Sequence, residues 1–249
     1  MARVLRLSWR QLLLEQRLFW RNPAAAFFGV VLPLIFLALF GAVFAGNRAN
    51  LDRLVPGVAG MSIAANTFAS LAMALPILRD QGVLKRIRGS ALPVPAYIAG
   101  LVGSAVVNAV VQVAVVIVAG RLFLGTPWPP LPLQLVAMVL LGVLCLSAVG
   151  IAYAHVIPSA EAASPYMNVV FLPALFISGT FFDPSHTPAF LRNVAEALPL
   201  AHIIDGLERT MVSGRPLSTI GSGLLVIGLW TVFGLWFAVR GFRWEGRGS

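Results

Sequence analysis

The feature that most constrains this chain is a series of long apolar runs without charged side chains. A helix rises about 1.5 Å per residue, so roughly 20 residues cross a hydrocarbon core about 30 Å thick. The sequence therefore predicts an all-α integral membrane protein that forms one transmembrane domain over residues 1–249. Its six transmembrane helices are expected at the runs that contain no Asp, Glu, Lys or Arg, namely 24–45, 55–78, 97–120, 133–157, 165–182 and 220–239.

The distribution of basic residues between these runs predicts an orientation. With a cytoplasmic N-terminus, twelve of the 18 Lys and Arg residues lie inside and six outside, as the positive-inside rule favours. We expect a multi-pass protein of the cell (plasma) membrane with both termini cytoplasmic. The net charge of +9 then follows from topology and from attraction to anionic membrane lipids, without a nucleic-acid partner.

Two amphipathic segments lie outside the apolar runs. In the segment 1–23, five arginines follow one helical face and large apolar side chains follow the other, before Asn22-Pro23 interrupts the pattern. This pattern favours an interfacial helix in the headgroup region, and a plain charged flank is the alternative. In the segment 183–219, Thr187-Pro188 and Pro199 each predict the start of a short helix, and Ser213-Gly214 predicts an end. We expect a re-entrant or surface-lying outer element between spans five and six.

Polar residues form one stripe in each of two spans. Ser62, Asn66 and Ser70 are spaced four apart in span two, and the same spacing recurs in span three at Ser104, Asn108 and Gln112. Residues four apart share a helix face, and an amide within lipid needs a hydrogen-bond partner. Both stripes should therefore face protein or a wet cavity. Interhelical packing is the first interpretation, and a substrate route along the span-two stripe is the second.

The sequence offers little for chemistry within this chain. His202, Asp205 and Glu208 are better explained as a solvated helix face than as a metal site, and His155 with Glu161 gives no convincing acid–base pair. A P-loop needs a lysine followed by Ser or Thr, but the only lysine, Lys85, is followed by Arg86. No predicted span carries the charged side chain that is typical of an ion-coupled pump. We expect no catalytic residue, no metal site and no cofactor in this chain.

Two ordered sets of residues resemble one family. The stretch RDQGVLKRIRGSALP, with the start of the next span, is similar to the loop between spans two and three of ABC type-2 transporter permeases. The matching positions are Arg79, Asp80, Gly82, Leu84, Arg86, Leu92, Pro93 and Gly100. Many relatives have a proline directly before the leucine, where this chain has Ser90-Ala91-Leu92.

A second stretch, from FLPALFISG to AHIIDGLE, resembles the region around span five of the same family. The positions that match are Leu172, Pro173, Ser178, Gly179, Phe181, Phe182, Pro184, Pro199, Leu200 and Asp205. Together with the six runs and the amphipathic N-terminus, the resemblance extends over essentially the whole chain.

The resemblance implies the membrane subunit of an ABC exporter for a drug-like or lipid-like amphipathic molecule. It implies two copies of a separate ATPase subunit, which bind ATP and Mg, and a second permease copy in a homodimer or a paralogous heterodimer. A membrane-embedded enzyme and a stand-alone channel or assembly scaffold remain as alternatives. The residues expected to couple to the motor are Arg79, Asp80, Gly82, Leu84, Lys85, Arg86 and Arg88.

The resemblance also implies a substrate route between the two permease halves, along spans one, two and five. The polar candidates on these spans are Ser62, Asn66 and Ser70, and the apolar candidates are Phe171 and Phe176. Apolar walls around a few polar groups suit an amphipathic cargo.

Overall fold

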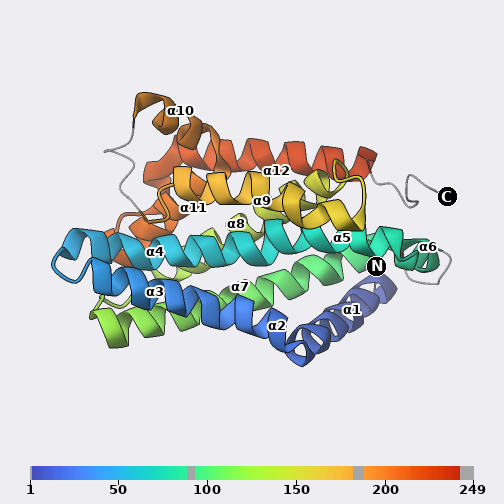
Figure 1. Cartoon of the computed structure of the whole chain (residues 1–249), viewed down its shortest axis with the longest axis horizontal. Coiled ribbons are helices and arrows are strands. Elements are labelled where there is room, and N and C mark those ends of the chain that lie inside the picture. Colours follow the sequence, from blue (N-terminus) through green and yellow to red (C-terminus); the bar gives the residue numbers. More distant parts are fainter. Residues whose placement is uncertain (1, 89–92, 182–187, 242–249) are drawn as a thin grey trace.

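The computed structural model describes residues 2–88, 93–181 and 188–241, and over these residues the chain is a bundle of helices without a strand (Figure 1). The helices are α1 (Ala2–Arg21), α2 (Pro23–Ala26), the π-helix η1 (Phe27–Val31), α3 (Leu32–Val43), α4 (Arg48–Ala64), the π-helix η2 (Ala65–Ala69), α5 (Ser70–Asp80), α6 (Val83–Arg88), α7 (Val94–Leu124), α8 (Pro132–Ala154), α9 (Ala160–Ile177), α10 (Ala189–Ala197), α11 (Pro199–Glu208), the π-helix η4 (Arg209–Ser213), the 3-10 helix η5 (Leu217–Ile220) and α12 (Gly221–Gly241).

Five of the predicted spans coincide with helices long and apolar enough to cross a membrane. These helices are Asn50–Asp80, Pro95–Leu124, Pro132–Ala154, Ala160–Ile177 and Leu217–Ala238. The first predicted span, 24–45, is helical through α2, η1 and α3, but its apolar helix Gly29–Val43 is shorter than these five. The described residues thus give five membrane-spanning candidates and one shorter apolar helix.

Local sequence signals explain several helix boundaries. Asn22 separates α1 from α2, as the Asn22-Pro23 pair predicts. Pro199 lies in the first turn of α11, and η4 ends at Gly214, which adopts φ +65°. The fifth span begins earlier than the predicted 165, because the Ser159 side chain caps α9 by accepting a hydrogen bond from the Ala162 N–H. Thr187, Leu92, Phe182 and Pro184 lie outside the described residues.

The bundle has two distinct ends (Figure 1). The start of α1, the α5–α6 connection and the last turns of α12 lie at one end, which we call the Arg79 end. The α3–α4 turn and α10 lie at the other, which we call the Arg53 end. The described parts of both terminal helices therefore reach the same end as the loop between spans two and three, as the predicted topology requires.

Glycines allow close packing at the centre of the bundle. Gly150 of α8 faces the backbone of Phe68 in η2, where an added Cβ would lie 2.9 Å from the Phe68 carbonyl oxygen. An added Cβ on Gly57 of α4 would overlap the carbonyl of Thr180, in the turn after α9. The backbones can approach closely at these positions because no side chain separates them.

One face of α11 is buried in the bundle. The helix packs against α4, α8 and α12, with Ile203 and Leu207 inaccessible to solvent. Ile204 covers Gly60 of α4, and Ile203 covers Gly142 of α8. The second short helix of the predicted outer element is therefore part of the packed core and does not merely lie on the surface.

Candidate functional site

Polar side chains join three helices inside the bundle. The Gln16 side-chain amide of α1 donates to the carbonyl of Ser104 at 3.0 Å, to the Ser104 hydroxyl at 2.9 Å and to Asn108 Oδ1 at 2.9 Å. Further along α7, Gln112 Oε1 accepts a hydrogen bond from Asn66 of η2. We call the set Gln16, Ser104, Asn108, Gln112 and Asn66 the polar junction.

The polar junction lies beside two irregular helical segments. Asn66 belongs to the π-helix η2, and its amide also donates to the Ser62 carbonyl at 2.8 Å. Gln112 Nε2 is buried without a hydrogen-bond partner among the described residues, and it faces Gly29 of the π-helix η1. π-Helical turns occur frequently at functional sites. Both π-helical segments, η1 and η2, contact the side-chain amide of Gln112 in span three.

The two predicted stripes have different partners. The span-three stripe binds α1 through Ser104 and Asn108 and binds span two through Gln112. In span two, the buried Ser62 hydroxyl donates only within its own helix, to the Val58 carbonyl at 2.8 Å, whereas Ser70 is exposed. Only Asn66 of the span-two stripe therefore makes a bond to another helix among the contacts described here.

The predicted motor-coupling residues divide into an anchored pair and an exposed pair. The Arg79 side chain, 8% exposed, donates to the carbonyls of Ile157 at 3.1 Å and Pro158 at 2.8 Å. Its neighbour Asp80 pairs with it at 3.3 Å and accepts from the Ala160 N–H at 2.7 Å. Arg79 and Asp80 thus bind the loop after span two to the loop between spans four and five.

The remainder of the motor-coupling segment turns outward. Gly82 adopts φ +70°, a left-handed conformation that glycine tolerates best, and it lets α6 start directly after α5. Leu84 is buried and anchors α6, while Lys85 and Arg86 are exposed. Arg88 ends the same short helix.

The apolar route candidates lie in different surroundings from the stripe. Phe171 of α9 lines an apolar cavity with residues of α8, α11 and α12, whereas Ser62, Asn66 and Ser70 do not contribute to its lining. Phe176 packs at 5.8 Å, between ring centroids, against Phe181, which also stacks on Phe40 at 4.6 Å. The structure of one chain therefore does not bring the five candidates into one cavity.

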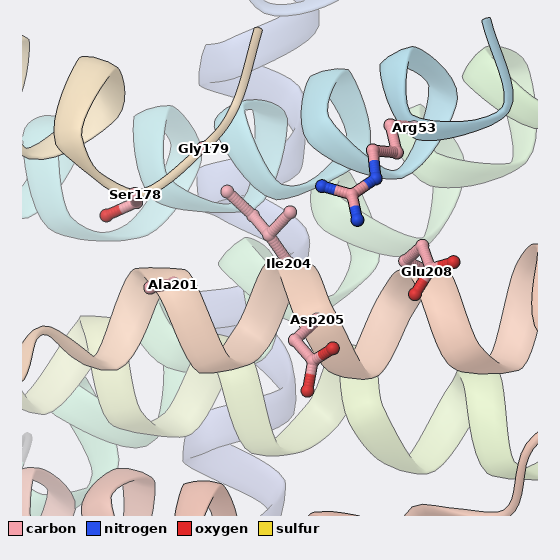
Figure 2. Close-up of a pocket in the computed structure, with 7 residues that line it drawn as sticks. All are labelled: Arg53, Ser178, Gly179, Ala201, Ile204, Asp205 and Glu208. Atoms are coloured by element: carbon pink, nitrogen blue, oxygen red, sulfur yellow. The ribbon is translucent and has the colours of Figure 1, made fainter. Parts of the chain in front are cut away.

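A polar pocket of about 320 Å³ lies at the Arg53 end (Figure 2). Arg53 extends from α4 toward α11, and Ile204 extends from α11 toward α4. Two carboxylates, Asp205 and Glu208, complete the lining from α11. Arg209 binds Asp205 through its Nε at 3.0 Å, and Glu208 accepts the Ser213 hydroxyl at 2.7 Å.

This pocket changes the interpretation of His202, Asp205 and Glu208. The two carboxylates are half-buried, and His202 turns to the Glu196 carbonyl at 2.8 Å. Within residues 2–88, 93–181 and 188–241, no three His, Cys, Asp or Glu side chains gather as a metal site would require. The surroundings are therefore those of a charged pocket between α4 and α11, not of a simple solvated face.

One carboxyl outside the spans has a shifted pKa. Burial of Glu15 on α1 raises the pKa of its carboxyl, and a hydrogen bond from the Gln11 amide, at 2.7 Å, opposes this effect. Glu15 directly precedes Gln16 of the polar junction in α1.

Sequence patterns did not indicate Gln16 or Arg53. Gln16 lies in a segment that the sequence shows only as an amphipathic helix, and Arg53 lies in a segment that it shows only as a short outer loop. The residues that surround each of them in the structure are far away in the chain. Gln16 lies four residues after Leu12 on the same helix face, and this spacing could have suggested that its amide faces a neighbouring helix.

Comparisons with known proteins agree with this architecture. The profile of a family described as ABC-2 type transporter matches residues 3–212. A protein named as a transport permease, ycf38 of Porphyra purpurea, is 28% identical over 212 residues, which are 78% of this chain and 71% of the relative. Nodulation protein J of Rhizobium meliloti (strain 1021) is 26% identical over 223 residues, 86% of this chain and 84% of the relative.

Proposed function

The chain belongs to the ABC-2 type transporter family, and from this premise we propose that it is the membrane subunit of an ABC exporter. The family match over residues 3–212 carries the proposal. A separate ATPase subunit, in two copies, supplies the energy and binds ATP and Mg. A second permease copy completes the assembly, and the cargo is a drug-like or lipid-like amphipathic molecule.

The proposed motor contact lies at the Arg79 end. Lys85 and Arg86 of α6 are exposed, whereas Arg79 is buried, so the contact is assigned chiefly to the basic residues of α6, Lys85, Arg86 and Arg88. Arg79 and Asp80 connect the loop after span two to the loop between spans four and five, and through this connection a movement of the motor subunit reaches spans two and five. Charged residues at the rim of such a contact steer and orient a soluble partner.

Purification of the tagged chain with its ATPase subunit tests this assignment. Reversing the charge with Arg86→Glu and Arg88→Glu should lower substrate-stimulated ATP turnover several-fold and leave the permease folded. The matched control is Arg215→Glu, an exposed arginine at the Arg53 end. Unchanged turnover in a complex of correct topology would mean that Arg86 and Arg88 only set orientation, and failure to isolate any ATPase subunit would argue against the exporter itself.

The proposed orientation places the Arg79 end and both termini in the cytoplasm. The outer element of α10 and α11 then lies on the opposite side, where it re-enters the membrane with α11. Cysteine labelling in intact cells tests this in a Cys145→Ser background. Arg215→Cys should react with an impermeant maleimide and Arg88→Cys should react only after permeabilisation. The reverse labelling would overturn the orientation.

The proposed route runs between two permease copies, along spans one, two and five. Asn66 and Ser70 supply polar groups, and Phe171 and Phe176 supply apolar walls; Ser62 is buried within span two and supports Asn66 from one turn before it. Asn66→Leu tests whether the amide contacts cargo. A cargo contact predicts intact assembly with a changed rank order of exported substrates. A changed assembly with unchanged rank order would assign Asn66 to packing alone.

A further inference from the structure

A second site lies inside one chain and shares only Phe171 with the proposed route. An apolar cavity of about 200 Å³ lies between η2, α8, α9, α11 and α12. Its walls include Phe68, Val149, Tyr153, Phe171, Ala174 and Trp230. An apolar cavity of about 150 Å³ is already large enough to remain dry and to bind benzene. This cavity can therefore hold a hydrophobic group of comparable or larger size.

The polar groups of Trp230 and Tyr153 in the cavity wall make hydrogen bonds to backbone carbonyls. The Trp230 indole N–H donates to the Ala197 carbonyl at 2.8 Å, and the Tyr153 hydroxyl donates to the Tyr166 carbonyl at 2.8 Å. A buried water needs two to four polar partners, and the lining of this cavity presents no polar atom to a water molecule. The cavity therefore suits an apolar occupant and gives poor support to water or to a polar molecule.

The cavity borders the outer surface of the bundle. Span five packs mainly on α5, whereas span six packs on α8, and the cavity lies where side chains of both spans meet those of α11. Val170 lines the cavity and is 39% exposed, and its neighbour Val169 is 73% exposed. In a membrane-spanning helix such exposed apolar side chains face hydrocarbon, so the molecule with direct access is a lipid chain.

We propose that this cavity binds one acyl chain of a membrane phospholipid. The acyl chain fills the space between spans five and six and makes dispersion contacts with Phe171 and Trp230. These contacts are missing when the cavity is empty. The site goes beyond the proposed function, because it lies within one permease and needs neither cargo nor the ATPase subunit. A side chain of a second copy is the competing occupant.

Tryptophan quenching provides a direct test, because bromine atoms on an acyl chain quench an indole that they touch. One version of the full chain keeps Trp230 and replaces the other five tryptophans with Phe, and a companion version keeps only Trp236. Both are placed in phosphatidylcholine vesicles with dibrominated acyl chains. Trp236 is 48% exposed on the outer face of α12 and reports ordinary lipid contact.

The expected result depends on a variant that fills the cavity. Ala174→Phe should at least halve the quenching of Trp230 and leave that of Trp236 unchanged. Val169→Phe is the matched control, because it adds the same ring on the outer face of the same helix and should change neither signal. Val149→Phe, from α8, repeats the test if Ala174→Phe does not fold.

Two results would overturn the proposal. The first is a Trp230 that brominated chains do not quench, which would mean that the cavity is closed or filled by a second copy. The second is equal quenching of Trp230 with and without the filling variants. Native mass spectrometry of the unmodified chain supplies an independent measure: the wild type should retain one more phospholipid than Ala174→Phe, and equal retention would contradict the site.

Discussion

The polar stripes of spans two and three share the same spacing but have different surroundings. In span three, two of the three residues bind Gln16 of the N-terminal helix and the third binds Asn66. In span two, Asn66 alone bonds to another helix within the described part of the chain, while Ser62 is buried and Ser70 is exposed. Periodicity places residues on one face, but the neighbouring helices decide what that face does.

The span-three stripe therefore holds helices together, whereas most of the span-two stripe takes no part in that contact. The span-three residues hold α1 against α7, so an amphipathic segment that could lie loosely on the membrane is fixed to the bundle. The span-two stripe contributes one amide to that contact and leaves an exposed hydroxyl beyond it. The predictions below test this division, starting with the largest expected effect.

The first prediction concerns the anchor of α1. Gln16→Leu removes a donor that contacts Ser104 and Asn108 and should lower the free energy of unfolding by roughly 2 kcal/mol, since a net hydrogen bond contributes about 0.5–1.5 kcal/mol. Unfolding of the purified chain in mild detergent measures the loss. Leu18→Ala, on the exposed side of α1, should cost much less. Equal losses in the two variants would mean that Gln16 does not anchor α1.

The second prediction concerns the bond that joins the stripes. In a double-mutant cycle of Asn66→Leu and Gln112→Leu, the coupling free energy should be about 0.6–2 kcal/mol, the range for hydrogen bonds between membrane helices. The same unfolding measurement on four proteins gives this value. Asn66→Leu with Gln16→Leu is the comparison cycle and should couple more weakly, because those side chains do not touch directly. A coupling near zero between Asn66 and Gln112 would contradict a bond between the stripes.

The third prediction uses the pH dependence of α1. Burial raises the pKa of Glu15 in the folded chain above its usual 4.5. As pH rises, the Glu15 carboxyl therefore loses its proton at a lower pH in the unfolded chain than in the folded chain. Stability is therefore lost as pH rises from about 4.5 through the folded pKa, and the loss remains at neutral pH. Glu15→Gln keeps an acceptor for Gln11 and should be more stable than wild type at pH 7, with the advantage gone near pH 4.

The matched control for this prediction is Glu196→Gln, an exposed carboxylate on α10. Its stability relative to wild type should change less between pH 4 and pH 7. If Glu15→Gln shows the same advantage at both pH values, the cause is packing and not ionisation.

The sequence predicted the features that depend on neighbouring residues. Charge-free runs located five spans, and Pro199 and Gly214 marked the ends of a helical segment. The break between α1 and α2 followed from Asn22-Pro23. These signals are local, because each one changes the backbone conformation or the hydrogen bonding of its own turn.

The features that the sequence did not predict depend on distant pairs. The anchoring of Arg79 needs two carbonyls almost eighty residues later, and nothing near Arg79 distinguishes it from an exposed loop arginine. Similarly, the burial of α11 depends on Gly60 and Gly142 in two other helices. Composition identifies a basic loop and an amphipathic helix, but it cannot indicate which cations have partners inside the bundle.

The smallest effects are expected from one hydroxyl in each stripe. The Ser62 hydroxyl donates to a carbonyl of its own helix, so Ser62→Ala should change the free energy of unfolding by less than about 0.5 kcal/mol, as model membrane proteins suggest for weak polar contacts. The Ser104 hydroxyl accepts from Gln16 of another helix, so Ser104→Ala should cost about 0.5–1.5 kcal/mol. Both changes remove the same atom from the same spacing, and detergent unfolding of the two variants compares the surroundings alone. A larger loss for Ser62→Ala would reverse the division between the stripes. Equal losses would show that the Ser104 hydroxyl adds nothing to the bond with Gln16, and α1 would then be anchored through the Ser104 carbonyl and Asn108.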